Sequence, residues 1–228
     1  GFDAIYLAFG AQKAKSMRLP GEDTIAGVIP GIDFLWQLQG EKKPEIYGNV
    51  VVVGGGNTAI DAARSAKRLG AEKVTLLYRR TRNEMPAHSM EIDAALEEKV
   101  ELILLAAPTE LVHENGRLKA LTCIRMELGE ADASGRRSPV PVSGSEYQLP
   151  CDFVISAIGQ DVDLCGLHKN QQLQSTRHNT LVFNEATFET SLPGVFTGGD
   201  MATGPAVAIA AIAHGKIAAN AIDHFIRS

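Results

Sequence analysis

Three consecutive glycines, Gly54, Gly55 and Gly56, are the residues of this sequence whose types and spacing most directly suggest chemistry. They follow a run of four valines and precede Asn57, Thr58 and Ala59, so the segment reads Gly-x-Gly-x-x-Ala. The first glycine of such a pattern permits a sharp turn, and the second lets a pyrophosphate approach the backbone. The final small residue lets a helix pack closely on a strand. The spacing predicts a turn that holds the phosphates of a dinucleotide.

The residues on either side predict the elements that position this turn. The valines at 50–53 are typical of a parallel strand buried on both faces. Beyond the glycines, alanines recur at helical spacing, and Gly70 stands where a glycine commonly ends a helix. A helix that begins near Asn57 would point its unpaired N–H groups and positive dipole end at the phosphates. The predicted binding residues of the turn are Gly54, Gly55, Gly56, Asn57, Thr58 and Ala59.

A second apolar run, residues 74–78, ends in a tip that bears on the choice of dinucleotide. Proteins that bind NAD or FAD usually place Asp or Glu there, where it accepts a hydrogen bond from the ribose 2′-OH. This tip instead carries Arg79, Arg80 and Arg82 and no carboxylate. Guanidinium groups can hold a phosphate bidentately. A solvated basic strand end would look the same in isolation, but after a complete strand–glycine–helix unit the arginines favour NADP(H).

Composition and charge limit the function classes. The chain has 228 residues, of which 45% are hydrophobic, enough for one large or two small domains. A net charge of −5 argues against a nucleic-acid or anionic-membrane surface as the main role. No apolar run reaches the roughly 18 residues that would span a bilayer. We therefore expect no nucleic-acid partner and no membrane partner.

The cysteines and histidines are too sparse for a metal site or a disulfide framework. The three cysteines, Cys123, Cys151 and Cys165, are odd in number and widely spaced, and no Cys-x-x-Cys pair occurs. We expect reduced thiols, a cytoplasmic protein and no metal ligands.

The remainder of the unit is predicted as an α/β domain with an insert. We expect a short helix over 31–38, a helix over 90–99 and a strand over 100–105. Segments 109–114, 118–128 and 146–149 predict an antiparallel meander, with a hairpin at Asn115-Gly116. Residues 129–144 are expected to form an exposed loop.

Other segments at the two ends of the chain predict a second nucleotide fold. Residues 3–11 and 152–160 both suggest buried strands that end in glycine, and residues 181–183, 186–189 and 195–197 suggest short strands. After Gly198 and Gly199, Asp200 offers a carboxylate to a hydroxyl-rich ligand, and Pro205 suits the first turn of a helix. That helix, rich in alanine as far as about residue 226, is expected to be buried. A tight turn before a core helix would explain the same residues.

Several of these segments together resemble one family, the flavoproteins with two dinucleotide folds that are related to the small subunit of glutamate synthase. These flavoproteins belong to the pyridine nucleotide-disulfide oxidoreductase superfamily. The same module resembles parts of dihydropyrimidine dehydrogenase and of ferredoxin–NADP transhydrogenases. The segments that carry the resemblance are residues 2–11, 19–22, 54–63, 78–87, 157–160 and 194–205.

The resemblance implies a Rossmann-like NADPH-binding domain, a parallel sheet with an antiparallel meander insert, placed within a partial FAD-binding domain. In such proteins NADPH gives a hydride to FAD, and electrons pass on to an iron–sulfur protein or domain. Arg79 and Arg80 would then clamp the 2′-phosphate, and Asp200 would contact FAD. The implied cofactor sites also include Gly159, Gln160, Gly199, Gly204 and Pro205.

The resemblance also implies a domain layout. Residues 1–44 would be part of the FAD domain with a linker, 45–185 the NADPH domain, and 186–228 the C-terminal part of the FAD domain. The family's first glycine motif and its cysteine-rich cluster domain have no counterpart in these 228 residues. We therefore expect NADPH binding, with FAD held weakly or not at all.

Three functional interpretations stay open at this point. The first is the NADPH-binding portion of a flavin-dependent oxidoreductase, and the second is a non-catalytic NADP(H)-binding module that acts only with a separate flavin-binding half. The third, a flavin-free dehydrogenase, would need a catalytic Tyr–Lys or His arrangement that the sequence does not show. Cofactors carry the hydride chemistry in such enzymes, so no catalytic residue is assigned. Glu84 could lie near the nicotinamide or be a plain exposed carboxylate.

Overall fold

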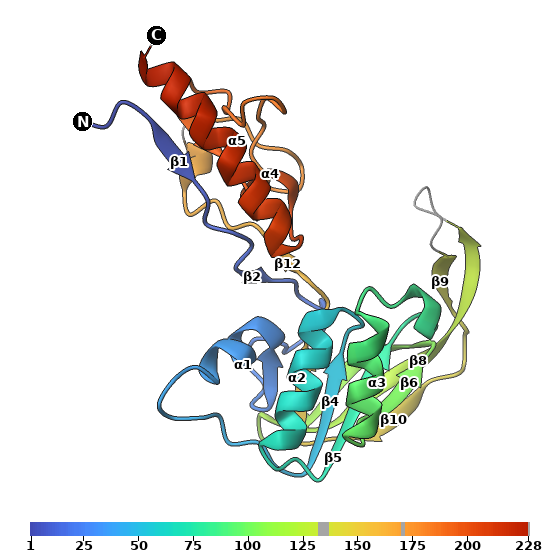
Figure 1. Ribbon diagram of the computed structural model, residues 1–228. Helices are drawn as coiled ribbons and strands as arrows, with labels where there is room; N and C mark the ends of the chain where they lie inside the picture. The colour runs from blue at the N-terminus through green and yellow to red at the C-terminus, as the bar shows by residue number, and fades with distance from the viewer. Residues whose placement is uncertain (132–136, 170–171, 228) are drawn as a thin grey trace. The chain divides into compact units, whose positions relative to one another are not determined.

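The computed structural model describes residues 1–131, 137–169 and 172–227, which form two compact units (Figure 1). Unit 1 comprises residues 1–13 and 160–228, and unit 2 comprises residues 14–159. The chain passes between the units twice, close to the short paired strands β2 (Lys13–Ala14) and β12 (Gln160–Asp161).

A five-stranded parallel sheet forms the centre of unit 2, in the order β3-β11-β4-β5-β6. Its strands are β3 (Val28–Pro30), β4 (Asn49–Val53), β5 (Lys73–Tyr78), β6 (Glu101–Leu104) and β11 (Phe153–Ser156). From β4 the chain adds β5 and β6 on one side, whereas β11 lies on the other. Strand β4 is therefore the topological switch point, where open α/β sheets bind ligands at their carboxyl ends.

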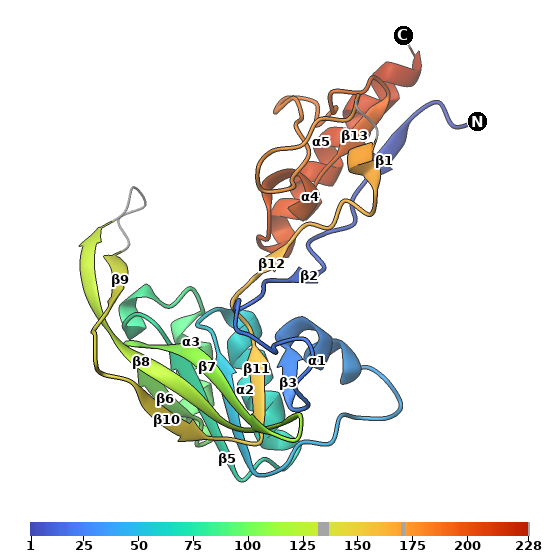
Figure 2. The same cartoon turned by 180° about the vertical axis from the view of Figure 1, so that it is seen from behind.

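Helices cover one face of this sheet and an antiparallel meander covers the other (Figures 1 and 2). The helices are α1 (Gly31–Gln37), α2 (Asn57–Arg68) and α3 (Ser89–Glu97). The meander strands are β7 (Ala106–Glu114), β8 (Arg117–Ala131) and β10 (Tyr147–Pro150), in the order β10-β8-β7. Because side chains alternate along a strand, Val50 and Val52 join the core under the helices, while Val51 and Val53 join the core under the meander. The expected valine strand, buried on both faces, is confirmed.

The Asn115-Gly116 hairpin is confirmed, with a positive φ of 51° and 76° at its two turn residues. The loop expected over 129–144 is wrong in part, because β8 continues to Ala131 and pairs with β9 (Arg137–Pro141). The Arg137 guanidinium donates hydrogen bonds to the carbonyls of Leu128 and Gly129, which joins the two strands. Residues 132–136 of that predicted loop lie outside the described residues.

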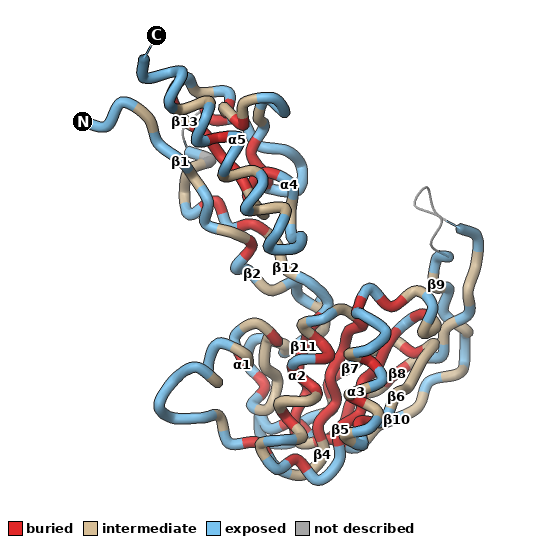
Figure 3. Tube along the Cα trace, viewed as in Figure 1, coloured by how far each residue is buried: buried red, intermediate tan, exposed pale blue. Residues whose placement is uncertain are grey.

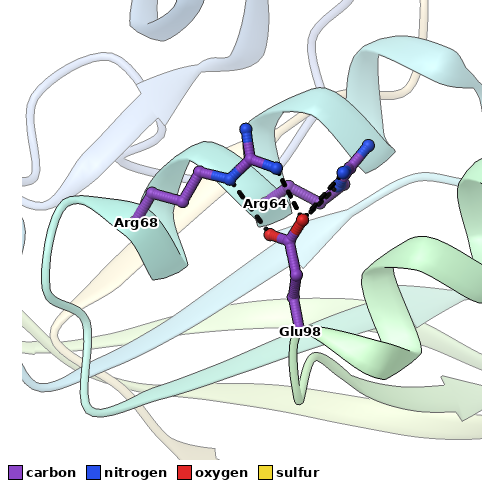
Figure 4. Close-up of polar contacts among 3 residues, drawn as sticks. All are labelled: Arg64, Arg68 and Glu98. Atoms are coloured by element: carbon purple, nitrogen blue, oxygen red, sulfur yellow. Dashed lines mark hydrogen bonds and ion pairs between the residues drawn. The ribbon is translucent and has the colours of Figure 1, made fainter.

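An ion-pair cluster fastens α2 to the end of α3 (Figure 4). The Glu98 carboxylate accepts hydrogen bonds from Arg64 and Arg68, one helical turn apart, with N–O distances of 2.7 and 2.6 Å for the closest pairs. These hydrogen bonds, first that of Arg68 and then that of Arg64, hold the pKa of Glu98 below its usual value. Helix α2, which carries the glycine turn at its start, is thereby held at its far end.

Unit 1 is built around a much smaller sheet, in which β1 (Ile5–Leu7) pairs in parallel with β13 (Val195–Thr197). The short helix α4 (Asp200–Thr203) and the long helix α5 (Ala208–Arg227) follow, and η2 (Leu167–Lys169) is a turn of 3₁₀ helix. Aromatic side chains fill part of its core, where Phe196 meets Phe225 edge-on at 6.0 Å between ring centroids.

Five expectations for unit 1 are wrong. The segment 3–11 forms a strand only at Ile5–Leu7, and residues 181–183 and 186–189 contribute isolated bridges only. Helix α5 begins at Ala208 rather than at Pro205. It is also largely exposed, with Ala218 its one buried residue among those described and Ile209 70% exposed (Figure 3). Two strands provide too little surface to cover a helix of 20 residues.

The compact units do not follow the expected domain limits at 44/45 and 185/186. Residues 14–44 lie in unit 2 because β3 and α1 join its sheet and its core, where Phe34 is fully buried. Residues 160–185 lie in unit 1, where Leu164 and Leu181 pack with Met201. The assignment of the units to particular cofactors stays a prediction.

Candidate functional site

The three glycines between β4 and α2 have three different environments. Gly54 has a φ of +152°, and a Cβ built on it would lie 2.2 Å from the carbonyl oxygen of Ala157. A Cβ on Gly55 would lie 2.5 Å from the ring of Tyr78. A Cβ on Gly56 would meet no described atom within 4 Å beyond its immediate neighbours along the chain. The protein's own packing therefore accounts for the first two glycines, while Gly56 faces open space where a ligand can approach the backbone.

The start of α2 is well suited to an anion. Gly56 is the N-cap, no side chain caps the helix, and its first turn contains no acidic residue. The partial positive charge of the helix start is therefore left for an external group. Ala59 is fully buried, which permits the close helix–strand approach that the sequence predicted. Asn57 accepts a hydrogen bond from the backbone N–H of His88 through Oδ1 (3.2 Å), so its side chain fixes the start of α3 beside the turn.

The arginines at the tip of β5 have different environments. Arg79 is exposed to solvent. Arg80 is only 8% exposed, and its Nε donates a hydrogen bond to the carbonyl oxygen of Arg137 on β9 (2.7 Å). Arg82 forms an ion pair with Asp93 on α3. Of the predicted pair, Arg79 is thus the residue that is exposed, and Arg80 anchors the tip to β9.

Glu84 shapes this tip rather than standing as a plain carboxylate. It ends the 3₁₀ turn η1 (Arg82–Glu84), where its carboxylate accepts hydrogen bonds from the backbone N–H and the hydroxyl of Thr81. The Thr81 hydroxyl is the main cause of a pKa of Glu84 below its ordinary value. The Tyr78 hydroxyl donates to the Glu84 carbonyl oxygen (2.7 Å), while the Tyr78 ring packs beside Gly55. One tyrosine therefore joins the arginine tip to the glycine turn, a role that the sequence did not reveal.

The end of β11 adjoins the glycine turn. The Ala157 N–H donates to the carbonyl oxygen of Val53 (2.8 Å), which places the two strand ends side by side. Gly159 has a φ of +114°, and its carbonyl oxygen accepts a hydrogen bond from the Lys15 N–H (3.0 Å). Gly159 belongs to unit 2 and Gln160 to unit 1, so the two residues of this predicted pair belong to different units.

Unit 1 contains its own pocket of about 450 Å³. Gly199 and Asp200 line it, whereas Gly204 and Pro205 do not belong to its lining. Asp200 also accepts a hydrogen bond from the N–H of Ala206 (3.1 Å). Most of the remaining lining residues are small, namely Ala8, Gly10, Gly198, Ala206, Ala208, Ala211 and Gly215. A large ligand could therefore lie close to the backbone, with a carboxylate at one side to accept from its hydroxyl groups.

Two aromatic side chains around this pocket were missed by the sequence reasoning. The hydroxyl of Tyr6 lies only 2.0 Å from where a Cβ on Gly198 would stand, so this glycine makes room for the tyrosine. Burial raises the pKa of Tyr6. His214 accepts a hydrogen bond from the Gly199 N–H through Nδ1 (3.1 Å), and its ring packs against that of Phe188 at a tilt of 31°. Neither residue belongs to a short motif, and the sequence offered no signal for them.

Other kinds of chemistry find little support. Burial raises the pKa of both Cys123 and Cys151 to about 12, so neither thiol is an activated nucleophile. In the described ranges, no three or more His, Cys, Asp or Glu residues are placed to hold a metal ion. Within the same residues, no helix has both the length and the apolar character needed to cross a membrane.

Known proteins match this chain over nearly its whole length. Residues 1–215 match the pyridine nucleotide-disulphide oxidoreductase family. The chain is 46% identical over 228 residues to the NADP(+)-dependent formate dehydrogenase subunit beta of Moorella thermoacetica, covering 99% of this chain and 32% of that protein. It is 44% identical to the NADPH-Fe(3+) oxidoreductase subunit beta of Geobacter sulfurreducens, covering 99% and 37%. With the glutamate synthase [NADPH] small chain of Azospirillum brasilense it shares 34% identity, covering 99% and 49%.

Solved structures share the fold. Mycobacterium tuberculosis FprA in complex with NADPH superimposes with a TM-score of 0.75 at 18% identity, covering 99% of this chain and 63% of that one. Thioredoxin reductase of T. acidophilum gives 0.72 at 18% identity, covering 99% and 66%. The predicted mixed α/β fold is confirmed. The chain spans 32% to 49% of the length of the relatives compared above.

Proposed function

The chain belongs to the pyridine nucleotide-disulphide oxidoreductase family, and we propose that it is the NADP(H)-binding portion of a flavin-dependent oxidoreductase. The observation that carries the proposal is the open Gly56 at the uncapped start of α2, beside a strand tip that presents Arg79. Two relatives with at least 44% identity carry NADP(+) or NADPH in their names.

In this proposal unit 2 binds the dinucleotide along the carboxyl ends of its strands. The pyrophosphate lies against Gly56 and the first N–H groups of α2, and Arg79 contacts the 2′-phosphate. When bound, NADPH supplies a hydride and FAD accepts it. Residues of unit 2 bind and orient, and none of them is required to donate or accept a proton.

We further propose that unit 1 is the part of a flavin-binding domain that contributes Asp200. Its pocket of small residues suits a large ligand with hydroxyl groups. Its apolar surface is extensive, since Phe9, Ile209 and Ile212 are 45%, 70% and 53% exposed. The remainder of such a domain would bury these side chains and complete the flavin site, so these residues alone would hold FAD weakly or not at all.

Iron–sulfur proteins or domains are the proposed electron partners, and the cytoplasm is the proposed location. The first follows from the resemblance to glutamate synthase small subunits, one of which is a 34% identical relative. The second is supported by three cysteines that are all free thiols.

The exposed surface of unit 1 favours a second candidate, a non-catalytic NADP(H)-binding module that acts only with a separate flavin-binding half. Dye reduction by NADPH with added FAD distinguishes the oxidoreductase portion from the non-catalytic module. Turnover by the 228-residue protein supports the oxidoreductase portion, and NADPH binding without turnover supports the module.

Arg79→Ala is the direct test of the binding site. The wild-type protein should bind NADP⁺ more tightly than NAD⁺, and the variant should lose roughly 10- to 100-fold in NADP⁺ affinity, the value of one charge-assisted contact. Affinity for NAD⁺ should stay nearly unchanged. Isothermal titration calorimetry measures both constants.

Lys73→Ala provides the matched control. Lys73 is a cation at the opposite end of β5, where it pairs with Glu101, and its removal should leave the cofactor preference intact. Equal binding of NADP⁺ and NAD⁺ by the wild-type protein would refute the assignment.

A further inference from the structure

The pocket of unit 1 has two walls that come from different elements. The turn over residues 198–200 forms one wall, and helix α5 forms the other through Ala208, Ala211 and Gly215. The shape of this pocket, whose volume is about 450 Å³, therefore depends on how closely the turn lies to the helix.

A side-chain hydrogen bond joins the two walls. The backbone N–H of Gly199, on the turn, donates to Nδ1 of His214, on α5, at 3.1 Å. Gly199 has a φ of +58° and a ψ of −146°, a region of backbone conformation that is essentially restricted to glycine. Because glycine has many other conformations open to it, contacts from outside the turn are needed to keep this one. The bond to His214 is such a contact.

This hydrogen bond determines which nitrogen of the His214 ring carries the proton. The backbone N–H is the donor, so Nδ1 must be unprotonated, and the neutral ring then carries its proton on Nε2. A protonated imidazole has an N–H group at both nitrogens and no acceptor. Protonation of His214 therefore places two N–H groups against each other and removes the bond to the turn.

Aromatic packing holds the imidazole in this orientation. The ring of Phe188 lies 4.5 Å from that of His214 between centroids, and Phe183 stacks on Phe188 at 4.9 Å. Phe188 is only 5% exposed, so it is itself fixed in the core of unit 1. The His214 ring cannot turn into solvent on protonation without losing this packing.

Neighbouring groups belong to residue types that change charge outside the range in which histidine does. The titratable and charged side chains on the elements packed around His214 are Asp200 on the turn, Tyr6 on β1, Glu185 and Glu189 on the segment that carries Phe188, and Lys216 on α5 itself. Carboxylates ordinarily titrate near about pH 4 and lysines near about pH 10, whereas histidines titrate near about pH 6.5. Burial raises the pKa of Tyr6, so its phenol is neutral throughout this range.

We propose that His214 is a pH-sensitive latch on the pocket of unit 1. The neutral imidazole holds the turn over 198–200 against α5, and the protonated imidazole releases it. The pocket is therefore organised above about pH 6.5 and loosened below it. The latch requires neither NADP(H) at the glycine turn of unit 2 nor a particular ligand in the pocket, so its test is separate from that of the proposed function.

The test follows the Gly199 N–H of the 228-residue protein by amide hydrogen exchange and NMR between pH 8 and pH 5. Its protection, corrected for the intrinsic exchange rate at each pH, should fall by about five- to tenfold on acidification, the value of one hydrogen bond. His214→Asn supplies an amide oxygen as an acceptor that does not titrate, so protection in this variant should stay constant. His224→Asn, at an exposed histidine of the same helix, should behave like the wild type.

Two results would overturn the latch. One is Gly199 protection that stays constant from pH 8 to pH 5 in the wild-type protein. The other is a fall of equal size in His214→Asn, because another group would then be responsible. Should that variant not fold, the wild-type ring decides. Long-range ¹H–¹⁵N NMR at pH 8 should show the His214 proton on Nε2, and a proton on Nδ1 would overturn the proposal.

Discussion

The two units of this chain differ in how completely each one buries its own elements. In unit 2, five strands lie between helices and a meander, and the central strands are almost fully buried. In unit 1, two strands lie beside a helix of 20 residues that has a single buried side chain among those described. Figure 3 shows the contrast, with buried strands in unit 2 and a mostly exposed α5 in unit 1. Unit 2 therefore covers its central sheet with its own elements.

The largest expected effect uses one isoleucine from each unit. Ile155 on β11 is fully buried, and Ile155→Ala should lower the free energy of unfolding of unit 2 by about 2–5 kcal/mol. Ile209→Ala on α5, at a residue 70% exposed, should change stability by less than about 0.5 kcal/mol. Urea unfolding followed by circular dichroism measures both. If Ile209→Ala lowered the free energy of unfolding by nearly as much as Ile155→Ala, α5 would have to be covered by other protein surface in solution.

The second prediction separates folding from binding within the glycine turn. Gly54→Ala should cost about 3 kcal/mol, because it imposes a positive φ on alanine and drives a Cβ into the Ala157 carbonyl. Gly56→Ala, at a φ of −94° and in open space, should leave stability within about 0.5 kcal/mol yet weaken NADP⁺ binding roughly tenfold or more. Thermal melts and calorimetry test the pair. Unimpaired NADP⁺ binding by Gly56→Ala would contradict the ligand position.

The smallest effect concerns the ion-pair cluster on α2. Glu98→Gln should lower the free energy of unfolding by about 1 kcal/mol at neutral pH. This is the size expected when a partly exposed carboxylate loses its ion pairs with two arginines. The folded protein lowers the pKa of Glu98, so this contribution is complete above the unfolded value of about 4.3. It is lost as the pH falls through the lower folded value.

Urea midpoints of the wild-type and Glu98→Gln proteins should therefore converge below about pH 4. Glu97→Gln, at an exposed neighbouring carboxylate on α3, serves as the control and should behave like the wild type throughout. A gap between wild type and Glu98→Gln that widens on acidification would contradict this account.

Sequence reasoning succeeded where local patterns control structure. The valine run, the glycine turn, the alanine-rich start of α2 and the Asn115-Gly116 hairpin each follow from backbone preferences of a few residues. It failed where the answer depends on what packs against a segment. Helix α5 has an apolar composition typical of buried helices, but its burial depends on elements that lie elsewhere in space.

The candidate functional residues show the same division between local patterns and long-range contacts. Arg79 and Arg80 are adjacent and identical in type, so nothing in the sequence could show that Arg80 is committed to the Arg137 carbonyl of a hairpin 57 residues away. Long-range contacts of this kind have no local pattern to reveal them.

The position of Tyr78 has a consequence for redesigning the cofactor preference. Its ring fills the space beside Gly55 and its hydroxyl holds the η1 turn, so one side chain sets the shape of both the phosphate turn and the arginine tip. Substitution of Arg79 alters the charge at the tip without changing the Tyr78 side chain. Replacement of Tyr78 would loosen both parts together. We therefore expect that the coenzyme preference can be changed by substituting exposed residues of the tip while Tyr78 is kept.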